Sequence, residues 1–511
     1  MRRLLLLTAS ILIACQAVNS LAPLPAINTR LTPTTSPVTP QPTLTPTPTL
    51  TPTPIPEEGF SVRLHPDGPL YVGDQVSIEV ISPDDGDQEE KNVQIRVDGL
   101  APNDLGSSGF EEYGIGRRLQ ATFSWVWDTS DLESGDYHIE FSVQPVGPEW
   151  TETISLLPAV DVPSPEPMAR WETIVIDCCE VHFISGTDFA QDLPDLLDVI
   201  QVQAEDAVQR MGIEFEQRVP ITILPRVLGH GGFAGNEIYV SYINGNYAGN
   251  NLSQVLHHEM IHILDRQLGG ELRPSLFVEG LAVYLSDGHF KKEPLLPRAA
   301  ALLDLGWYIP LNDLADSFYT SQHEIGYLEG AALVQFMVNR YGWQAFNDFY
   351  RDIYPHPSGD QSQAIDQAML NHFGLTLEQL ESKFKTDLHR QNINPDMYED
   401  VILSVTYYEA VRRYQRMLDP SAYFLTAWLP DGEQMRKRGI VADYLRRPTT
   451  LENQVIEELL VDIDLYIRAG NYLKAEKELN LVEQKLDLIE KDTLIGTFQP
   501  EEAQHSDIKF D

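Results

Sequence analysis

The stretch that decides the fold is residues 251–286, which read NLSQVLHHEMIHILDRQLGGELRPSLFVEGLAVYLS. Apolar residues recur at helical spacing from about 251 to 268, and Gly269-Gly270 offers a left-handed cap, so this half predicts one helix. Ser275 to Leu285 predicts a second helix. Gly269-Gly270 and Pro274 lie between the two and reverse the chain, so the second helix is expected to return against the first.

The first of these helices carries the pattern His258-Glu259-Met260-Ile261-His262. His258 and His262 are about one turn apart, so their imidazoles share a face and can hold one tetrahedral metal ion. Glu259 lies on the flank of that face, where it can act on a metal-bound water without becoming a ligand. The pattern predicts a zinc site with a built-in general base, and therefore a hydrolase.

A catalytic zinc ion usually needs a third protein ligand and an open position. A third histidine is not available at the spacing of another common zinc motif, because Leu268 stands there, and Asp265 is placed to serve only as an outer partner. Glu279 follows His262 by seventeen positions and opens the sequence EGLAVY. The predicted reversal of the chain brings Glu279 back against the two histidines.

This arrangement resembles the gluzincin metallopeptidases, and the region from Val181 to His389 looks like the peptidase MA-like domains of bacterial surface proteins. The resemblance implies that one Zn²⁺ is held by His258, His262 and Glu279. It also implies hydrolysis of the peptide bonds of a peptide or protein substrate, by a zinc-bound water that the general base activates.

The resemblance further implies a donor for the oxyanion and a strand for the substrate. Tyr327, which opens YLEGAALVQF, is the candidate donor, and His323 is the alternative, although ordinary packing or a surface position remains open for both. In the resembling families an edge strand before the motif helix pairs with extended peptide, a role expected here for residues 236–242 after the flexible Gly-rich residues 229–232.

The first residues predict export. Arg2 and Arg3 form a positive start, and Leu4 to Ala14 is apolar but too short for an ordinary transmembrane span. The ending Leu12-Ile13-Ala14-Cys15 resembles the lipobox of bacterial lipoproteins, which implies a signal peptide over residues 1–14 and a lipid on Cys15 that anchors the protein to the extracellular face of the cell membrane. A plain secretory signal with an incidental Cys15 is the alternative.

The next segment, residues 15–57, contains TPTTSPVTPQPTLTPTPTLTPTPIP. Proline lacks the backbone donor and fixes φ, so this Thr/Pro-rich linker is expected to be an extended, semi-rigid spacer.

Composition limits the partners. The chain has 511 residues and a formal net charge of −40, which argues against nucleic acid, because phosphate binding needs an excess of Lys and Arg. The 3 cysteines, Cys15, Cys178 and Cys179, provide no disulfide framework. For the adjacent pair, buried thiols are the preferred interpretation and a vicinal disulfide the alternative.

Residues 58–163 predict a β-sandwich, because short runs of alternating apolar and polar residues are separated by turn residues. Its FSWVWDT and LESGDY sequences look like bacterial immunoglobulin-like modules, with Trp125 and Trp127 expected on one face in the core. Residues 166–395 predict an α+β peptidase MA-like zinc domain, and residues 396–511 an all-α region. The sandwich and the helical tail are the expected docking places for a protein partner.

Three functions are consistent with these features. The preferred one is a lipid-anchored extracellular zinc metallopeptidase in which Glu259 activates the water. The second is a non-catalytic surface binding lipoprotein with a peptidase-like domain. The third is a metal-dependent hydrolase that acts on bonds other than peptide bonds.

Overall fold

The computed structural model describes residues 59–83, 91–99, 103–113, 117–225, 231–243, 245, 247, 251–289, 291–418, 432–446 and 450–496. The signal segment, Cys15 and the Thr/Pro-rich linker lie outside these residues, so export and lipid attachment stay predictions. No helix of the described part of the chain is both long and apolar enough to cross a bilayer.

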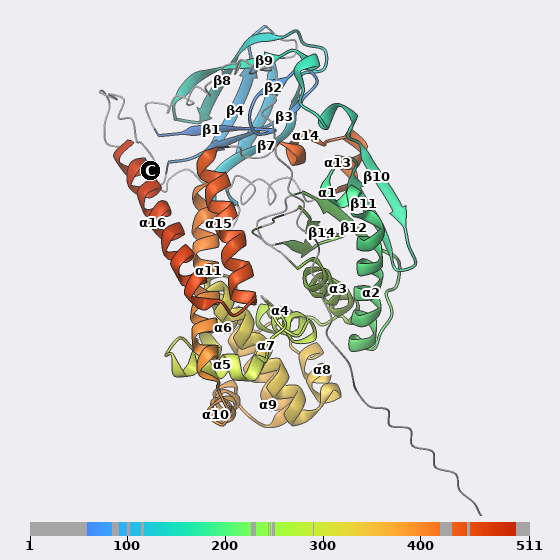
Figure 1. The fold of residues 1–511 in the computed structure, drawn as a ribbon, viewed down its shortest axis with the longest axis vertical. Coiled ribbons are helices and arrows are strands. Elements are labelled where there is room, and N and C mark those ends of the chain that lie inside the picture. The colour runs from blue at the N-terminus through green and yellow to red at the C-terminus, as the bar shows by residue number, and fades with distance from the viewer. Residues whose placement is uncertain are drawn as a thin grey trace, which may run out of the picture. The chain divides into compact units, whose positions relative to one another are not determined.

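The first strands form two sheets that share one apolar core (Figure 1). The alternation predicted from the sequence is visible in β8, where every second residue from Ile139 to Val143 is buried. One sheet has the order β1-β3-β7-β6 and the other β2-β9-β8-β4-β5. The strands are β1 (Ser61–His65), β2 (Leu70–Tyr71), β3 (Gln75–Ile81), β4 (Asn92–Val97), β5 (Asp104–Gly109), β6 (Glu111–Tyr113), β7 (Arg118–Asp128), β8 (Gly135–Gln144) and β9 (Glu149–Leu157).

Trp125 and Trp127 do not share an environment, so their expected common place in the core is wrong. Trp127 is 1% exposed and belongs to the sandwich core. Trp125 has a φ of 48° at the place where the β3–β7 register shifts, and its indole Nε1 donates to Asp443 Oδ2 at 2.9 Å. The irregularity breaks the two-residue alternation and turns Trp125 out of the sandwich.

The central region contains a third sheet, of order β10-β11-β12-β14-β13. Strands β11, β12 and β14 are parallel, whereas β10 and β13 are antiparallel to their neighbours and form the two edges. The strands are β10 (Trp171–Val175), β11 (Cys179–Ile184), β12 (Val219–Leu224), β13 (Gly232–Ala234) and β14 (Ile238–Ser241). Two short 3-10 turns, at Ala159–Asp161 and Glu166–Met168, lead into it.

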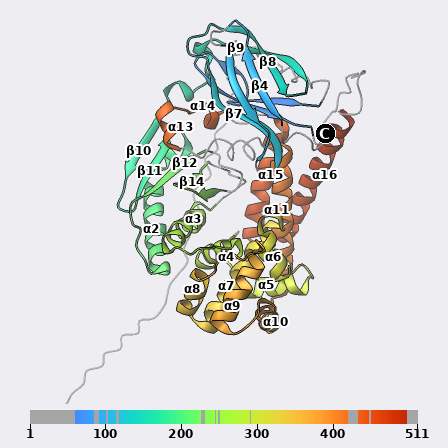
Figure 2. The same cartoon turned by 180° about the vertical axis from the view of Figure 1, so that it is seen from behind.

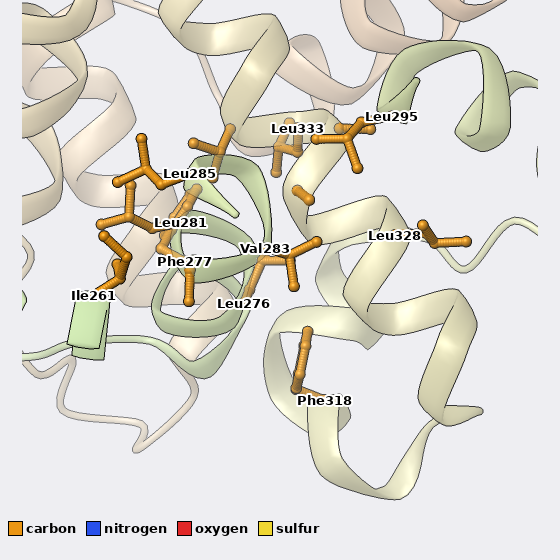
Figure 3. Close-up of a cluster of buried hydrophobic side chains, with 14 of the residues drawn as sticks. Ile261, Leu276, Phe277, Leu281, Val283, Leu285, Leu295, Phe318, Leu328 and Leu333 are labelled. Carbon is orange, nitrogen blue, oxygen red and sulfur yellow. The ribbon is translucent and has the colours of Figure 1, made fainter. Parts of the chain in front are cut away.

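Helices cover this sheet and extend the core beyond it (Figure 1). Leu281 and Phe277 of α4 are buried in the same cluster as Ile261 of α3 and Leu328 of α7 (Figure 3). The helices are α1 (Asp188–Gln191), α2 (Leu193–Met211), α3 (Leu252–Leu268), α4 (Ser275–Leu285), α5 (Leu295–Asp304), α6 (Leu311–Ser317), α7 (His323–Tyr341), α8 (Trp343–Arg351), α9 (Gln361–Phe373) and α10 (Leu377–Leu388), with a 3-10 turn at Phe318–Thr320.

The C-terminal helices contribute to two cores. Helices α11, α15 and α16 run side by side around their own apolar cluster (Figure 2). Met435 and Tyr444, from α13 and α14, instead pack against Leu224 and Tyr239 of the central sheet. The helices are α11 (Pro395–Met417), α13 (Gly432–Arg438), α14 (Ala442–Leu445), α15 (Leu451–Arg468) and α16 (Tyr472–Gly496).

Cys178 and Cys179 form a disulfide at the turn between β10 and β11, so the preference for a buried thiol pair is wrong. Cys179 is fully buried in the central core and Cys178 packs against it. Periodicity and burial do not distinguish two neighbouring thiols from a disulfide, which is why the sequence left both open.

Candidate metal centre

Helix α3 places three polar side chains of the motif beside one another. Its first turn is capped by Asn251, whose side chain accepts a hydrogen bond from the Gln254 backbone N–H. The buried Leu256 and Leu264 hold the helix against the central core. The helix therefore has a fixed rotation about its axis, and the histidines face away from the sheet core.

Helix α4 follows α3 after a chain reversal and brings a third side chain to the histidines. Gly269 and Gly270 have φ values of 76° and 125°, in the region that favours glycine, and Pro274 in extended conformation starts α4. Helices α3 and α4 then pack against each other, with Glu279 on the facing turn. The chain reversal predicted from the sequence is the feature that brings these residues together.

The three expected ligand residues converge on one point. Nε2 of His258 and Nε2 of His262 lie 3.0 Å apart, and Oε2 of Glu279 lies 3.3 Å from each of them. Three atoms bound tetrahedrally to one zinc ion, at bonds of about 2.0–2.1 Å, lie roughly 3.3 Å from one another. The three side chains are 14%, 12% and 9% exposed, so each keeps a small contact with solvent. This donor set fits zinc.

Glu259 lies beside this point and under β13. It is 6% exposed, and its carboxylate accepts a hydrogen bond from the backbone N–H of Ala234. Arg266, two turns further along α3, donates to the carbonyl oxygens of Ala234 and Gly235. Edge strand β13 is thus held to α3 by Glu259, the expected general base, and by Arg266.

The buried carboxylate of Glu279 needs a positive charge beside it. Burial raises the pKa of Glu259 to about 7 and lowers that of His258 to about 4. Burial acts to lower the pKa of His262, but the charge and hydrogen bond of Glu279, together with the charges of Glu259 and Asp265, outweigh it and raise that pKa to about 9. Burial acts to raise the pKa of Glu279, but the charges and hydrogen bonds of His262 and His258 together hold it well below its usual range. Without metal, a proton on His262 provides the positive charge that a bound cation would supply.

Tyr327, the expected oxyanion donor, lies on α7 next to the ligands. Its ring centroid is 6.4 Å from that of His258, and it stacks on His289 at 4.3 Å. No hydrogen bond joins its hydroxyl to another residue that the structure describes, and burial raises its pKa well above the usual value, so the proton stays on. His323, the alternative donor, lies 4.5 Å from the Tyr327 ring and its Nδ1 pairs with Nη2 of Arg412.

Tyr319 is a site residue that the sequence did not reveal. Its hydroxyl donates to Oε1 of Glu279 at 2.7 Å, although it lies 40 positions further along the chain. It belongs to the 3-10 turn Phe318–Thr320 between α6 and α7. The surrounding sequence has neither a metal motif nor a distinctive period, so no sequence signal pointed to it.

Asp265 does not act as the direct outer partner that its spacing suggested. It is fully buried and accepts hydrogen bonds from Arg273, Arg351 and Tyr350. Nδ1 of His262 is buried and has no hydrogen-bond partner among the residues that the structure describes. Asp265 therefore anchors the end of α3 to α8, and it influences His262 only through its charge.

His257, the residue before His258, points away from the three expected ligands. Its Nδ1 lies 2.9 Å from the hydroxyl of Ser286, and its Nε2 lies 3.0 Å from Oδ2 of Asp206. These contacts join α3 to the end of α4 and to α2. The residue preceding the first metal ligand therefore fixes the helix in place.

The strand order changes the expected substrate edge. Residues 238–241 form β14, which lies between β12 and β13 and is not an edge. The edge is β13, residues 232–234, which begins inside the Gly-rich run expected to be a flexible loop. The alternation of apolar and polar residues that predicts a strand is missing there, because β13 has only 3 residues and begins at Gly232, directly after Gly231.

Comparisons with known proteins give only distant likenesses. No family model and no curated protein matches the chain. Among solved structures it is similar to an M1 zinc metallopeptidase variant from Deinococcus radiodurans, at 13% identity and a TM-score of 0.28, over 66% of this chain and 94% of that one. It is also similar to an aminopeptidase N family protein from Idiomarina loihiensis, at 9% identity and a TM-score of 0.29, over 67% of this chain and 78% of that one. Because both TM-scores are low, the description of the candidate site depends only on the distances and contacts given above.

Proposed function

We propose that this protein is a zinc-dependent metallopeptidase that hydrolyses peptide bonds. The observation that carries the proposal is the convergence of His258, His262 and Glu279 at tetrahedral spacing. A buried general base stands beside them, as hydrolysis requires. A bound zinc ion supplies Lewis acidity that polarises a carbonyl and makes water a nucleophile near neutral pH.

The chain's own residues supply the proton transfers and the positioning. The Glu259 carboxylate takes a proton from the attacking water and gives it to the leaving amine. The Tyr327 hydroxyl, which keeps its proton and has no described partner, donates to the developing oxyanion. An extended substrate pairs with the edge strand β13, which is fastened directly above the general base.

The experiment combines metal analysis with a mixed peptide library. Purified wild-type protein is expected to contain one zinc ion and to cleave the library. Glu259→Gln keeps the shape of the side chain but cannot take a proton, so it should retain zinc and lose activity by about 10²–10⁴-fold. If zinc is bound but wild type and variant are equally inert on peptides, the peptidase proposal fails and a binding role replaces it. If the protein takes up no zinc, the metal site itself fails.

We also propose that the enzyme is exported and held on the extracellular face of the membrane by lipid on Cys15, with an immunoglobulin-like sandwich as the spacer. The support is the apolar leader that ends Leu-Ile-Ala-Cys and the Thr/Pro-rich linker after it. Expression of the full chain and of Cys15→Ser, followed by separation of membranes, tests this. The wild type should sediment with membranes and the variant should not.

A further inference from the structure

Two tyrosines stand at the metal centre, and their hydroxyl groups have different surroundings. The hydroxyl of Tyr319 is bonded to the metal-ligand carboxylate of Glu279. That of Tyr327 has no hydrogen bond to a described residue. We propose that Tyr319 is a positioning residue that fixes Glu279 for the metal, and that Tyr327 alone is left to contact the substrate. This inference rests on the proposed metal site and deepens it.

The two oxygens of Glu279 have separate partners. Oε2 faces Nε2 of both histidines at 3.3 Å, whereas Oε1 accepts the Tyr319 hydroxyl at 2.7 Å. A carboxylate held in this way presents one oxygen to the ion and cannot rotate to present both. Outer partners of this kind orient a ligand and strengthen metal binding by about 10- to 100-fold.

The turn that carries Tyr319 is itself fixed. Phe318 is 4% exposed, and its ring lies 5.4 Å from that of Tyr319 and 5.2 Å from that of Tyr327. The Ser317 carbonyl oxygen accepts hydrogen bonds from Thr320 and Ser321, which close the turn. Tyr319 is nevertheless 66% exposed, so its hydroxyl is held by hydrogen bonds with Glu279 and with the side chain of Ser275, and not by burial of the ring.

This exposure makes a clean test feasible. Tyr319→Phe removes one hydroxyl from a largely exposed ring and leaves the ring itself in place. Tyr354→Phe is the matched control, because Tyr354 is 59% exposed and no contact that the structure describes joins it to the three ligand residues. Tyr327→Phe removes the second hydroxyl of the site. All three variants are made in the full chain and compared by zinc competition against a chelator of known affinity.

Tyr319→Phe is expected to bind zinc about 10- to 100-fold more weakly than the wild type. Tyr327→Phe and Tyr354→Phe should bind zinc like the wild type. The visible spectrum of the Co²⁺-substituted protein should change in Tyr319→Phe and stay unchanged in Tyr354→Phe, because only the first alters the ligand carboxylate. Neither zinc affinity nor the Co²⁺ spectrum depends on hydrolysis, so both can be measured even if the protein has no peptidase activity.

Two results would overturn the inference. One is wild-type zinc affinity together with a wild-type Co²⁺ spectrum in Tyr319→Phe. The other is a loss of zinc affinity in Tyr327→Phe as large as that in Tyr319→Phe, which would show that the two hydroxyls act alike. Zinc binding with no peptide hydrolysis in the wild type would reject the peptidase and leave the positioning role standing.

Discussion

Gly232 of β13 lies against Val255 of α3, one turn before Glu259, and the contact leaves no room for a side chain. A Cβ atom on Gly232 would come within 2.8 Å of Val255 Cγ1 and of the Tyr239 carbonyl oxygen, and within 3.5 Å of Glu259 Cγ. Because position 232 is glycine, β13 can pack closely on α3 beside Glu259. The same approach allows the Ala234 N–H to reach the carboxylate.

Gly232→Ala should therefore push β13 away from the general base. We expect a loss of peptidase activity on the order of 10²-fold, because small displacements of catalytic groups are costly, with a loss of about 1–3 kcal/mol in the free energy of unfolding. Gly235→Ala is the control, since its nearest atom would be 3.8 Å away. Steady-state kinetics and urea unfolding of both variants check this, and equal activities in the two would refute it.

A second glycine contact holds Glu279 and Tyr327 together. Helices α4 and α7 cross where Gly280 meets Gly330, and a Cβ on Gly280 would lie 2.6 Å from the Gly330 backbone. Gly280→Ala should separate the helices, lower the free energy of unfolding by about 1–3 kcal/mol and weaken zinc binding. Gly326→Ala, on α7 but 3.4 Å from its nearest neighbour, should be neutral or stabilising by up to about 1 kcal/mol. Urea unfolding and chelator competition distinguish the two variants.

Zinc should stabilise the folded protein. Since the three ligand residues come together only on folding, zinc at 100 times its dissociation constant should add about 2.7 kcal/mol to the free energy of unfolding. A chelator should remove this gain, and His262→Ala should not show it. His138→Ala, an exposed histidine on β8, should respond to zinc like the wild type. Thermal unfolding with and without zinc measures the effect.

The sandwich should lose stability in acid through one buried carboxylate. Glu79 is 1% exposed and accepts hydrogen bonds from Arg118 at 2.9 Å and Gln120 at 2.8 Å, with His65 at 3.3 Å. Burial acts to raise its pKa, but the hydrogen bond and charge of His65, with Arg118, lower it from 4.5 to about 2. Its contribution is complete above pH 4.5 and is lost as the pH falls from there towards 2, because the unfolded state then binds the proton first.

Glu79→Gln tests this pH dependence. The variant should be less stable than the wild type at neutral pH, and its free energy of unfolding should fall less steeply below pH 4.5. Glu140→Gln, an exposed position on β8, should follow the wild-type curve. Denaturant titrations across the acid range give the comparison, and parallel curves for Glu79→Gln and wild type would contradict the assignment.

The elements predicted from periodicity agree closely with the structure near the site. The second helix is predicted at Ser275 to Leu285, and α4 has those bounds. The reversal at Gly269-Gly270 could be predicted because it depends on local backbone preference. From this reversal alone, the sequence predicts that Glu279 reaches the two histidines. The function of these three residues as metal ligands stays a proposal.

The features that the sequence did not predict all depend on contacts between distant segments. Tyr319 reaches Glu279 from a short turn, and β13 is too short and too rich in glycine to show strand periodicity. Trp125 leaves the sandwich core because of an irregular register, and it meets Asp443 more than three hundred positions later. Local pattern carries no information on such pairings, since they arise only when the whole chain has packed.

The placement of α13 and α14 determines when the central sheet can finish folding. Met435 and Tyr444 cover one side of that sheet, and Arg446 pairs with Asp74 of the sandwich and with Glu166. A nascent chain that folds from its N-terminus as it is synthesised has none of these residues when β10 to β14 emerge. The apolar side of the sheet therefore stays uncovered until α13 and α14 have been synthesised. A chain that stops at residue 395 would leave Leu224 and Tyr239 exposed and would be prone to aggregation.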